Sequence, residues 1–182
     1  MSRQLSREEL LETYNLVGRF HEGLVWVEKG HEAFHVRRDG WPAYSEKYDA
    51  VGDFHEGLAW ARKDGQSFHI QRDGSPAYSQ RYDSVGDFHE GLAWARKDGR
   101  CFHINHNGLR AYHHSFENVG NFCEGLAWAK IGGEEFHIQR NGFPAYYNER
   151  YDCAENFHKG LARVRKGIKI FYIDSDGLPV TR

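Results

Sequence analysis

The segment FHEGLAWARKDG, at residues 54–65, decides how this chain folds because it recurs along the whole sequence. It returns unchanged at residues 88–99, and looser copies begin at Phe20, Phe122 and Phe157. Its glycine recurs at steps of 34 or 35 residues, at Gly23, Gly57, Gly91, Gly125 and Gly160. A constant period of this size indicates a protein built from tandem structural repeats.

The repeats divide the chain into an N-terminal cap, residues 1–13, and a single repeat domain, residues 14–182. In the cap, Ser6 and Glu9 have the spacing of a capping box, which predicts a short helix over residues 7–13 that lies over the first repeat. Five repeats follow one another without linkers, at residues 14–47, 48–81, 82–115, 116–150 and 151–182.

The second repeat illustrates the local structure that we expect in every copy. Asp64-Gly65 separates two segments of alternating residues and is typical of a two-residue hairpin turn, in which both residues need positive φ. Asp73-Gly74 predicts a second such turn, followed by a third strand over residues 75–78. The next stretch, residues 82–88, is either a fourth short strand or an irregular connection.

Two-residue turns also fix which residues face each other. They place Trp60 opposite His69 and His69 opposite Tyr78, and they place Ile70 opposite Ala77. Both faces of the meander then carry apolar residues, whereas a sheet with one solvated face would have a polar side. We therefore expect each meander to pack between its neighbours, with nearest-neighbour contacts along the array.

The resulting fold class is all-β, with five β-meander repeats stacked as an open β-solenoid or superhelix. The terminal copies depart from the template, as the ends of an open array do. In the fifth repeat, Arg163 replaces the tryptophan and Tyr172 replaces the histidine. A closed five-bladed β-propeller is the alternative architecture, since five copies can form a ring.

Composition excludes several classes of function. The chain has 24 Lys and Arg against 26 Asp and Glu, which gives no general reason to bind nucleic acid or an anionic membrane. No apolar segment approaches the length of a membrane-spanning helix, and the N-terminus lacks the apolar core of a secretory signal. Cysteines occur three times at unrelated repeat positions, which is a poor disulfide framework and favours the cytoplasm.

Histidines recur at two positions of the repeat and are the strongest chemical signal. One series follows the first phenylalanine, at His21, His55, His89 and His158; the other contains His35, His69, His103 and His137. The second series supplies weak candidates for metal ligands, but one histidine every 34 residues does not bring three or four ligands together in an open stack. We expect these side chains to be structural, and we expect no cofactor.

Two further patterns are candidates for chemistry or binding. Glu56 follows His55, but adjacent residues of an extended chain point to opposite faces, so acid–base catalysis is not expected. Tryptophans recur near basic residues, and such a ladder can bind sugar rings by stacking. Apolar residues that vary between copies follow the second turn and suit contact with a partner. The candidate ligand- or partner-binding residues are Trp41, Trp60, Trp94, Trp128 and Phe143, with Leu109 at the same position as Trp41.

The repeat resembles the WG-containing repeat (KWG) family. The resemblance covers residues 14–182 and is clearest in residues 157–164, with the motif FHKGLARV, and in residues 171–177, with FYIDSDG. The Trp-Gly dipeptide of that family is replaced here by Phe-His, or by Phe171-Tyr172 in the last copy. The resemblance implies a bacterial β-repeat protein used as a binding or scaffolding module.

We therefore expect a non-enzymatic scaffold for protein–protein interaction, with an unknown protein partner and a possible homodimer through the edges of the array. The alternative is a lectin-like module with one carbohydrate site per repeat. A histidine-rich metal-binding protein is the third hypothesis. Exposed tryptophans in shallow pockets would favour sugar binding, and converging histidines would favour metal binding.

Overall fold

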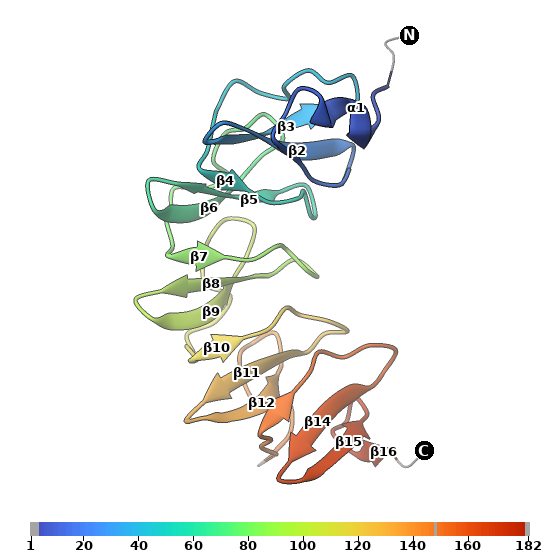
Figure 1. Cartoon of the computed structure of the whole chain (residues 1–182). Coiled ribbons are helices and arrows are strands. Elements are labelled where there is room, and N and C mark those ends of the chain that lie inside the picture. Colours follow the sequence, from blue (N-terminus) through green and yellow to red (C-terminus); the bar gives the residue numbers. More distant parts are fainter. Residues whose placement is uncertain (1–3, 148, 181–182) are drawn as a thin grey trace. The chain divides into compact units, whose positions relative to one another are not determined.

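The computed structural model describes residues 4–147 and 149–180 and shows an all-β protein with one short helix (Figure 1). The chain forms two compact units, Met1–Asp87 and Phe88–Arg182, so the boundary between them falls within the third repeat. The first unit contains α1 (Arg7–Leu11), β1 (Leu16–Val17), β2 (Leu24–Lys29), β3 (Glu32–Arg37), β4 (Ala50–Val51), β5 (Ala59–Lys63), β6 (Gln66–Ile70) and β7 (Ser84–Val85).

The second unit also alternates long hairpins with two-residue strands, and its described residues contain no helix. It contains β8 (Ala93–Lys97), β9 (Arg100–Ile104), β10 (Asn118–Val119), β11 (Ala127–Ile131), β12 (Glu134–Ile138), β13 (Cys153–Ala154), β14 (Ala162–Lys166), β15 (Lys169–Ile173) and β16 (Pro179–Val180). The sheets are small and antiparallel, in the orders β1-β2-β3, β4-β5-β6, β10-β11-β12 and β13-β14-β15-β16, and β8 pairs with β9. The predicted all-β repeat fold is therefore confirmed.

The first hairpin turn of the repeat forms as predicted. Asp64 and Gly65 have φ values of 53° and 75°, as a type I′ turn requires. The predicted pairing of Trp60 with His69 is confirmed, and Lys63 pairs with Gln66 next to the turn. A turn signal in the sequence thus specifies the register of the long strands.

The second turn is longer than predicted, and the register predicted beyond it is wrong by one residue. Ile70 pairs with Pro76 rather than with Ala77, because Arg72 joins the turn and the loop has three residues. Gly74 has a φ of 83°, while Asp73 is absent from the residues with positive φ, which is the pattern of a type I turn followed by a bulge.

The expected third strand is reduced to this single bridge in the second repeat, and only the fifth repeat extends it to the two-residue strand β16. A different segment completes each sheet. Two residues near the start of the repeat, such as Ala50–Val51 of β4, pair with the following strand β5. For residues 82–88, the alternatives were a fourth short strand and an irregular connection. The structure has the short strand there, β7.

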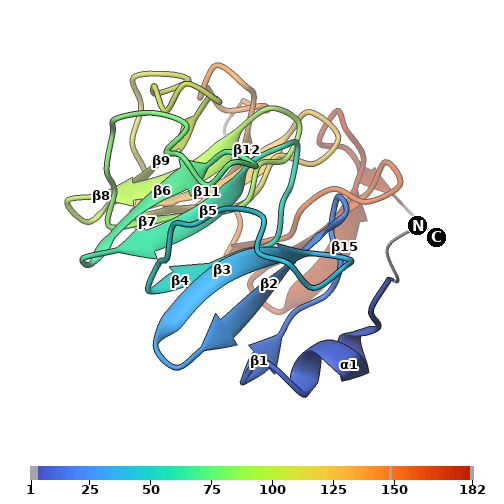
Figure 2. The same ribbon diagram turned by 90° about the horizontal axis from the view of Figure 1, so that it is seen from above.

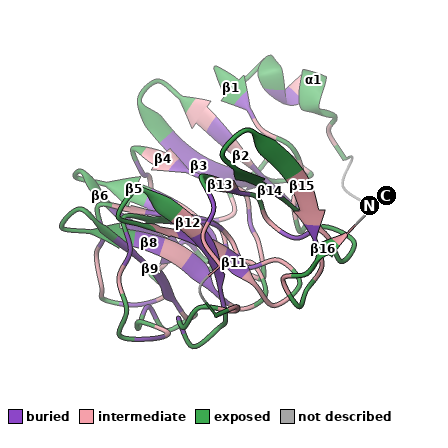
Figure 3. Ribbon diagram, turned by 90° about the horizontal axis from the view of Figure 1, so that it is seen from below, coloured by how far each residue is buried: buried purple, intermediate pink, exposed green. Residues whose placement is uncertain are grey.

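Burial follows the alternation expected for a sheet packed on both faces. Ala59, Ala61 and Ile70 are completely buried on one face, and His69 is completely buried on the other. Buried residues lie along the long strands and also include aromatic residues of the connections, such as Phe54 and Tyr78, while the first hairpin turn is exposed (Figure 3). Large side chains therefore fill the space between consecutive repeats.

Close packing between repeats depends on the glycine of the second turn. The ring of Tyr44, in the first repeat, lies so close to Gly74, in the second, that an added Cβ would come within 2.5 Å of the ring. Tyr112 and Gly142 repeat this arrangement in the second unit, with a corresponding distance of 2.6 Å. The glycine thus serves two purposes, since it also adopts the positive φ that the turn requires.

Helix α1 covers the first repeat, next to β1 (Figure 2). The predicted capping box of Ser6 and Glu9 is confirmed, but the helix ends at Leu11 rather than at residue 13. Leu5 lies over Gly40, where a preceding repeat would place its tyrosine. Arg7 donates hydrogen bonds to the carbonyl oxygens of Val17 and Gly18. These side chains replace contacts that inner repeats receive from the repeat before them.

Candidate functional site

The second series of histidines forms a buried layer between repeats. His35, His69, His103 and His137 are at most 1% exposed. Nδ1 of His35 lies 2.6 Å from Oη of Tyr44, in the same repeat, and Nε2 lies 2.9 Å from the carbonyl oxygen of Gly52, in the next. Both contacts recur at His69 and His103, whereas His137 makes only the Nε2 contact, with Glu155.

This geometry determines the protonation state of the rings. A carbonyl oxygen only accepts hydrogen bonds, so Nε2 carries the proton and the neutral ring accepts from the tyrosine hydroxyl at Nδ1. Burial lowers the pKa of His35 and of His103 to about 4, which stabilises the neutral form. Both ring nitrogens of His35, His69 and His103 are engaged, so these side chains offer no free lone pair to a metal ion.

The glutamates of the Phe-His-Glu-Gly motif clasp successive repeats together. Glu56 and Gly57 both have positive φ, and they form a two-residue turn between His55 and Leu58. The carboxylate of Glu22, one repeat earlier, accepts a hydrogen bond from the N–H of Gly57 at 3.1 Å. Arg72 donates to the carbonyl oxygen of Glu22 at 2.6 Å and lies over the ring of Phe54.

The same clasp occurs in the second unit. Glu90 accepts hydrogen bonds from the N–H groups of Glu124 and Gly125, at 2.6 and 2.9 Å, and forms an ion pair with Arg140. Glu124 in turn accepts from the N–H of Gly160. These contacts assign Glu22, Glu90 and Glu124 to assembly of the array, with no histidine–glutamate pair placed for acid–base chemistry among them.

The tryptophans of the first long strand of each repeat are half-buried, and three of them lie over glycines that follow the short strands. An added Cβ would come within 2.2 Å of Trp26 at Gly18, 1.9 Å of Trp60 at Gly52 and 2.2 Å of Trp128 at Gly120. Trp94 is half-buried as well. In the fifth repeat both members of this pair change together: Glu155 replaces the glycine and Arg163 replaces the tryptophan, and their side chains form an ion pair at 2.7 Å.

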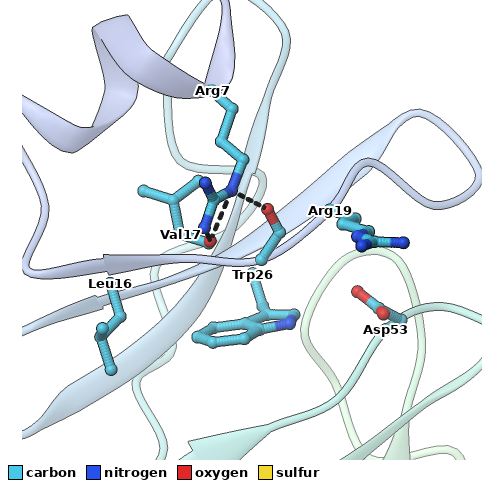
Figure 4. A pocket seen from close by; sticks show the side chains of 7 residues that line it. Arg7, Leu16, Val17, Arg19, Trp26 and Asp53 are labelled. Atoms are coloured by element: carbon cyan, nitrogen blue, oxygen red, sulfur yellow. Dashed lines mark hydrogen bonds between the residues drawn. The ribbon is translucent and has the colours of Figure 1, made fainter.

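Two open pockets lie beside these indole rings in the first unit. The first has a volume of about 520 Å³, and Figure 4 shows Trp26 between Arg7 and Asp53, with Arg19 near the carboxylate. The second, of about 380 Å³, contains Trp26, Trp60 and Asp53 in its lining. Each pocket thus combines an aromatic surface with charged side chains.

The predicted partner-binding residues after the second turn are exposed. Trp41 is 70% exposed and Phe143 is 56% exposed, and the same position holds Leu109 at 53% and Leu178 at 61%. Only Ser75, in the second repeat, is small and polar. A pocket of about 330 Å³ contains Phe143, His113 and His114, and the ring of His114 meets that of Phe143 edge-on at 4.7 Å.

Sequence reasoning missed the residues that position these side chains. These residues are Gly52, Asp53 and Arg72, and all three lie in predicted connections and turns. Gly52 supports the indole of Trp60, Asp53 lines both pockets, and Arg72 joins consecutive repeats. A signal was present, because Gly-Asp or Gly-Asn precedes the motif phenylalanine in three successive repeats, at residues 52–53, 86–87 and 120–121. No helix in the described part of the chain is long and apolar enough to cross a membrane.

Comparison with known proteins confirms the family resemblance and the fold. The model of the WG containing repeat matches residues 47–66, 72–101 and 150–169. No curated protein sequence matches the chain. Hsv2 from Kluyveromyces marxianus is 11% identical, with a TM-score of 0.60 over 91% of this chain and 61% of that chain. Hsv2 from Kluyveromyces lactis is 8% identical, with a TM-score of 0.54 over 88% and 60%.

The extracellular domain of the one component system BT4673 from B. thetaiotaomicron is 12% identical, with a TM-score of 0.50 over 91% of this chain and 28% of that chain. At such identities the likeness concerns the fold alone. The chain spans about three fifths of the length of the Hsv2 chains that it resembles.

Proposed function

We propose that this chain, which carries WG-containing repeats, is a non-enzymatic scaffold that binds a protein partner through the apolar residues after its second turns. One observation carries the proposal: four of the five repeats present a large exposed apolar side chain at this position, namely Trp41, Leu109, Phe143 and Leu178. Exposed aromatic and aliphatic anchors on a rigid framework are the usual centres of protein interfaces.

The surrounding structure supports this role. The turn that carries each anchor is held by hydrogen bonds, such as those from the N–H of Phe143 to Asn141 and from the N–H of Trp41 to Asp39. A rigid position lowers the entropic cost of binding. Glu22 and Glu90, which follow His21 and His89, are engaged in the clasps, and this favours a binding role over acid–base catalysis.

Serine substitutions test the proposal with little risk to the fold, because Ser75 occupies the same position in the second repeat. A variant with W41S, L109S, F143S and L178S should keep the melting temperature of the parent. A partner is first isolated by affinity purification with the parent chain, and its dissociation constant is then measured with purified proteins. Loss of one aromatic anchor should weaken binding about thirtyfold.

The matched control is Ile168→Ser, since Ile168 is 99% exposed but lies in the first turn of the fifth repeat. It should leave the affinity unchanged. A quadruple variant that binds the partner as tightly as the parent would refute the assignment of this surface.

A carbohydrate is the second candidate ligand, and the pocket beside Trp26 favours it. Sugar rings stack on aromatic faces and accept or donate hydrogen bonds at charged side chains, and this pocket offers an indole with Arg7, Arg19 and Asp53. Titration of the tryptophan fluorescence with a panel of oligosaccharides tests this function. A saturable change that is lost in Trp26→Ala would support it, and no change with any sugar would remove it.

A further inference from the structure

The first series of histidines differs from the buried series in position and in environment. His21 and His55 occupy the same place in the first and second repeats, where each begins the tight turn of the motif. Their rings lie 5.1 Å apart, centroid to centroid, and are inclined by 42°. The repeat period thus places one imidazole beside the next in the first unit.

Asp53 joins these two histidines from the second repeat. One ligand atom from each of His21, Asp53 and His55 lies within 4.8 Å of the other two. All three residues are half-buried, and the side chains of His21 and Asp53 keep 41% and 26% of their accessible surface. An ion from solvent can therefore reach the group without opening the core.

The Asp53 carboxylate is not satisfied by its contact with His21. Nε2 of His21 lies 3.7 Å from Oδ2 of Asp53, which is too long for a hydrogen bond. Oδ1 of the same carboxylate is buried and has no hydrogen-bond partner among the described residues. A buried carboxylate oxygen without a partner is costly, and a cation bound to the carboxylate would offset that cost.

We propose that His21, Asp53 and His55 bind one divalent transition-metal ion, of which Zn²⁺ fits the ligands best. Two imidazoles and a carboxylate are ligands that Zn²⁺ accepts, with bonds of about 2.0–2.2 Å. Donor atoms around one tetrahedral ion lie about 3.3 Å apart at these bond lengths, so small side-chain rotations from 4.8 Å suffice. A water molecule completes the fourth position.

Neighbouring groups favour this site over the corresponding positions of the fourth and fifth repeats. Oδ2 of Asp87 lies 3.7 Å from Nε2 of His55, which places a second negative charge beside the group. In the fourth and fifth repeats Asn121 and Asn156 replace Asp53, and Cys123 replaces the histidine of the fourth repeat. Those repeats therefore lack the anionic ligand.

Asp53→Asn is the decisive variant, because asparagine at this position is already part of the fold at residues 121 and 156. Calorimetric titration of the full chain with Zn²⁺, and visible absorption after addition of Co²⁺, measure affinity and coordination separately. The parent chain should bind one ion per chain with a tetrahedral Co²⁺ spectrum. Asp53→Asn, His21→Ala and His55→Ala should each weaken binding at least about tenfold.

His158→Ala is the matched control, since His158 has the same place in the fifth repeat but lies near Asn156 in sequence. His113→Ala/His114→Ala removes the adjacent histidine pair at residues 113–114. Both controls should retain the affinity and the spectrum of the parent, and circular dichroism should show that every variant is folded. Absence of saturable binding, or equal binding by the parent and Asp53→Asn, would overturn the proposal.

Discussion

Gly52→Ala should destabilise the first unit because the indole of Trp60 occupies the space of the new methyl group. Gly52 does not have a positive φ, so alanine is compatible with the backbone and the effect comes from packing alone. The added Cβ would lie 1.9 Å from Nε1 and 2.4 Å from Cδ1 of Trp60. Ordinary contacts between such atoms are about 3.5 Å or longer, so the ring must move by more than about 1.5 Å.

Displacements of this kind lower the free energy of unfolding of a well-packed protein by about 1–3 kcal/mol. For a chain of about 150–250 residues, each kcal/mol lowers the melting temperature by about 2–4 °C, so the expected decrease is about 2–12 °C. Trp60→Ala removes a half-buried side chain and should cost less than the roughly 3–5 kcal/mol of a fully buried tryptophan.

The assay is a double-mutant cycle followed by urea denaturation. In the Trp60→Ala background the space above Gly52 is vacant, so Gly52→Ala should cost close to zero, and the coupling between the two sites should be at least about 1 kcal/mol. Gly52→Glu/Trp60→Arg copies the Glu155–Arg163 pair of the fifth repeat and should be more stable than Gly52→Glu alone. A Gly52→Ala penalty of the same size in both backgrounds would refute the packing argument.

Acid should weaken the fold through His35 and His103, whose pKa is about 4 in the folded protein and about 6.5 when unfolded. Between these values the unfolded chain binds more protons, so the free energy of unfolding should fall as the pH decreases from about 6.5 to about 4, by up to about 3 kcal/mol per histidine. Below about pH 4 these histidines should add little further change. Urea midpoints across this range measure the effect, and in His103→Phe the midpoint should depend less steeply on pH. Glu90→Gln should lower the free energy of unfolding by about 1 kcal/mol, and by less in high salt, because the ion pair with Arg140 is partly exposed. Thermal melts at two salt concentrations check this, and a loss of stability that does not depend on salt would contradict the ionic contribution. Cys101 is 4% exposed, so Ellman's reagent should modify it more slowly than the other two thiols, and equal rates would contradict its burial.

Local sequence signals predicted the features that depend on a few neighbouring residues. The Asp64-Gly65 turn and the pairing of Trp60 with His69 follow from backbone preferences and from the period of a strand. The register after Asp73-Gly74 did not follow, because the same dipeptide fits turns of two and of three residues. The longer turn meets the preceding repeat, where Tyr44 lies against Gly74 and Glu22 accepts from Arg72, and a single repeat does not contain that information.

The role of each candidate residue depended on which partner lies across the repeat interface. The two histidine series have the same spacing of 34 residues. Both ring nitrogens of His69 are hydrogen-bonded, to Tyr78 and Gly86, whereas His21 and His55 lie near Asp53 at the surface. Their spacing does not reveal this difference, since hydrogen bonding and burial are properties of the packed array. The exposure of Trp41 and Phe143 was predictable, because residues just after a turn lie at the surface.

The amino-acid sequence by itself determined the number of repeats, the all-β fold and the family resemblance, because the period and the turn residues act over short distances along the chain. Only the tertiary structure decided which polar groups are satisfied and which remain available. Each repeat completes its hydrogen bonds and its packing with atoms of the next repeat, as His35 does with Gly52 and Glu22 with Gly57. That physical dependence on the neighbouring repeat separates the structural histidines from the proposed metal ligands.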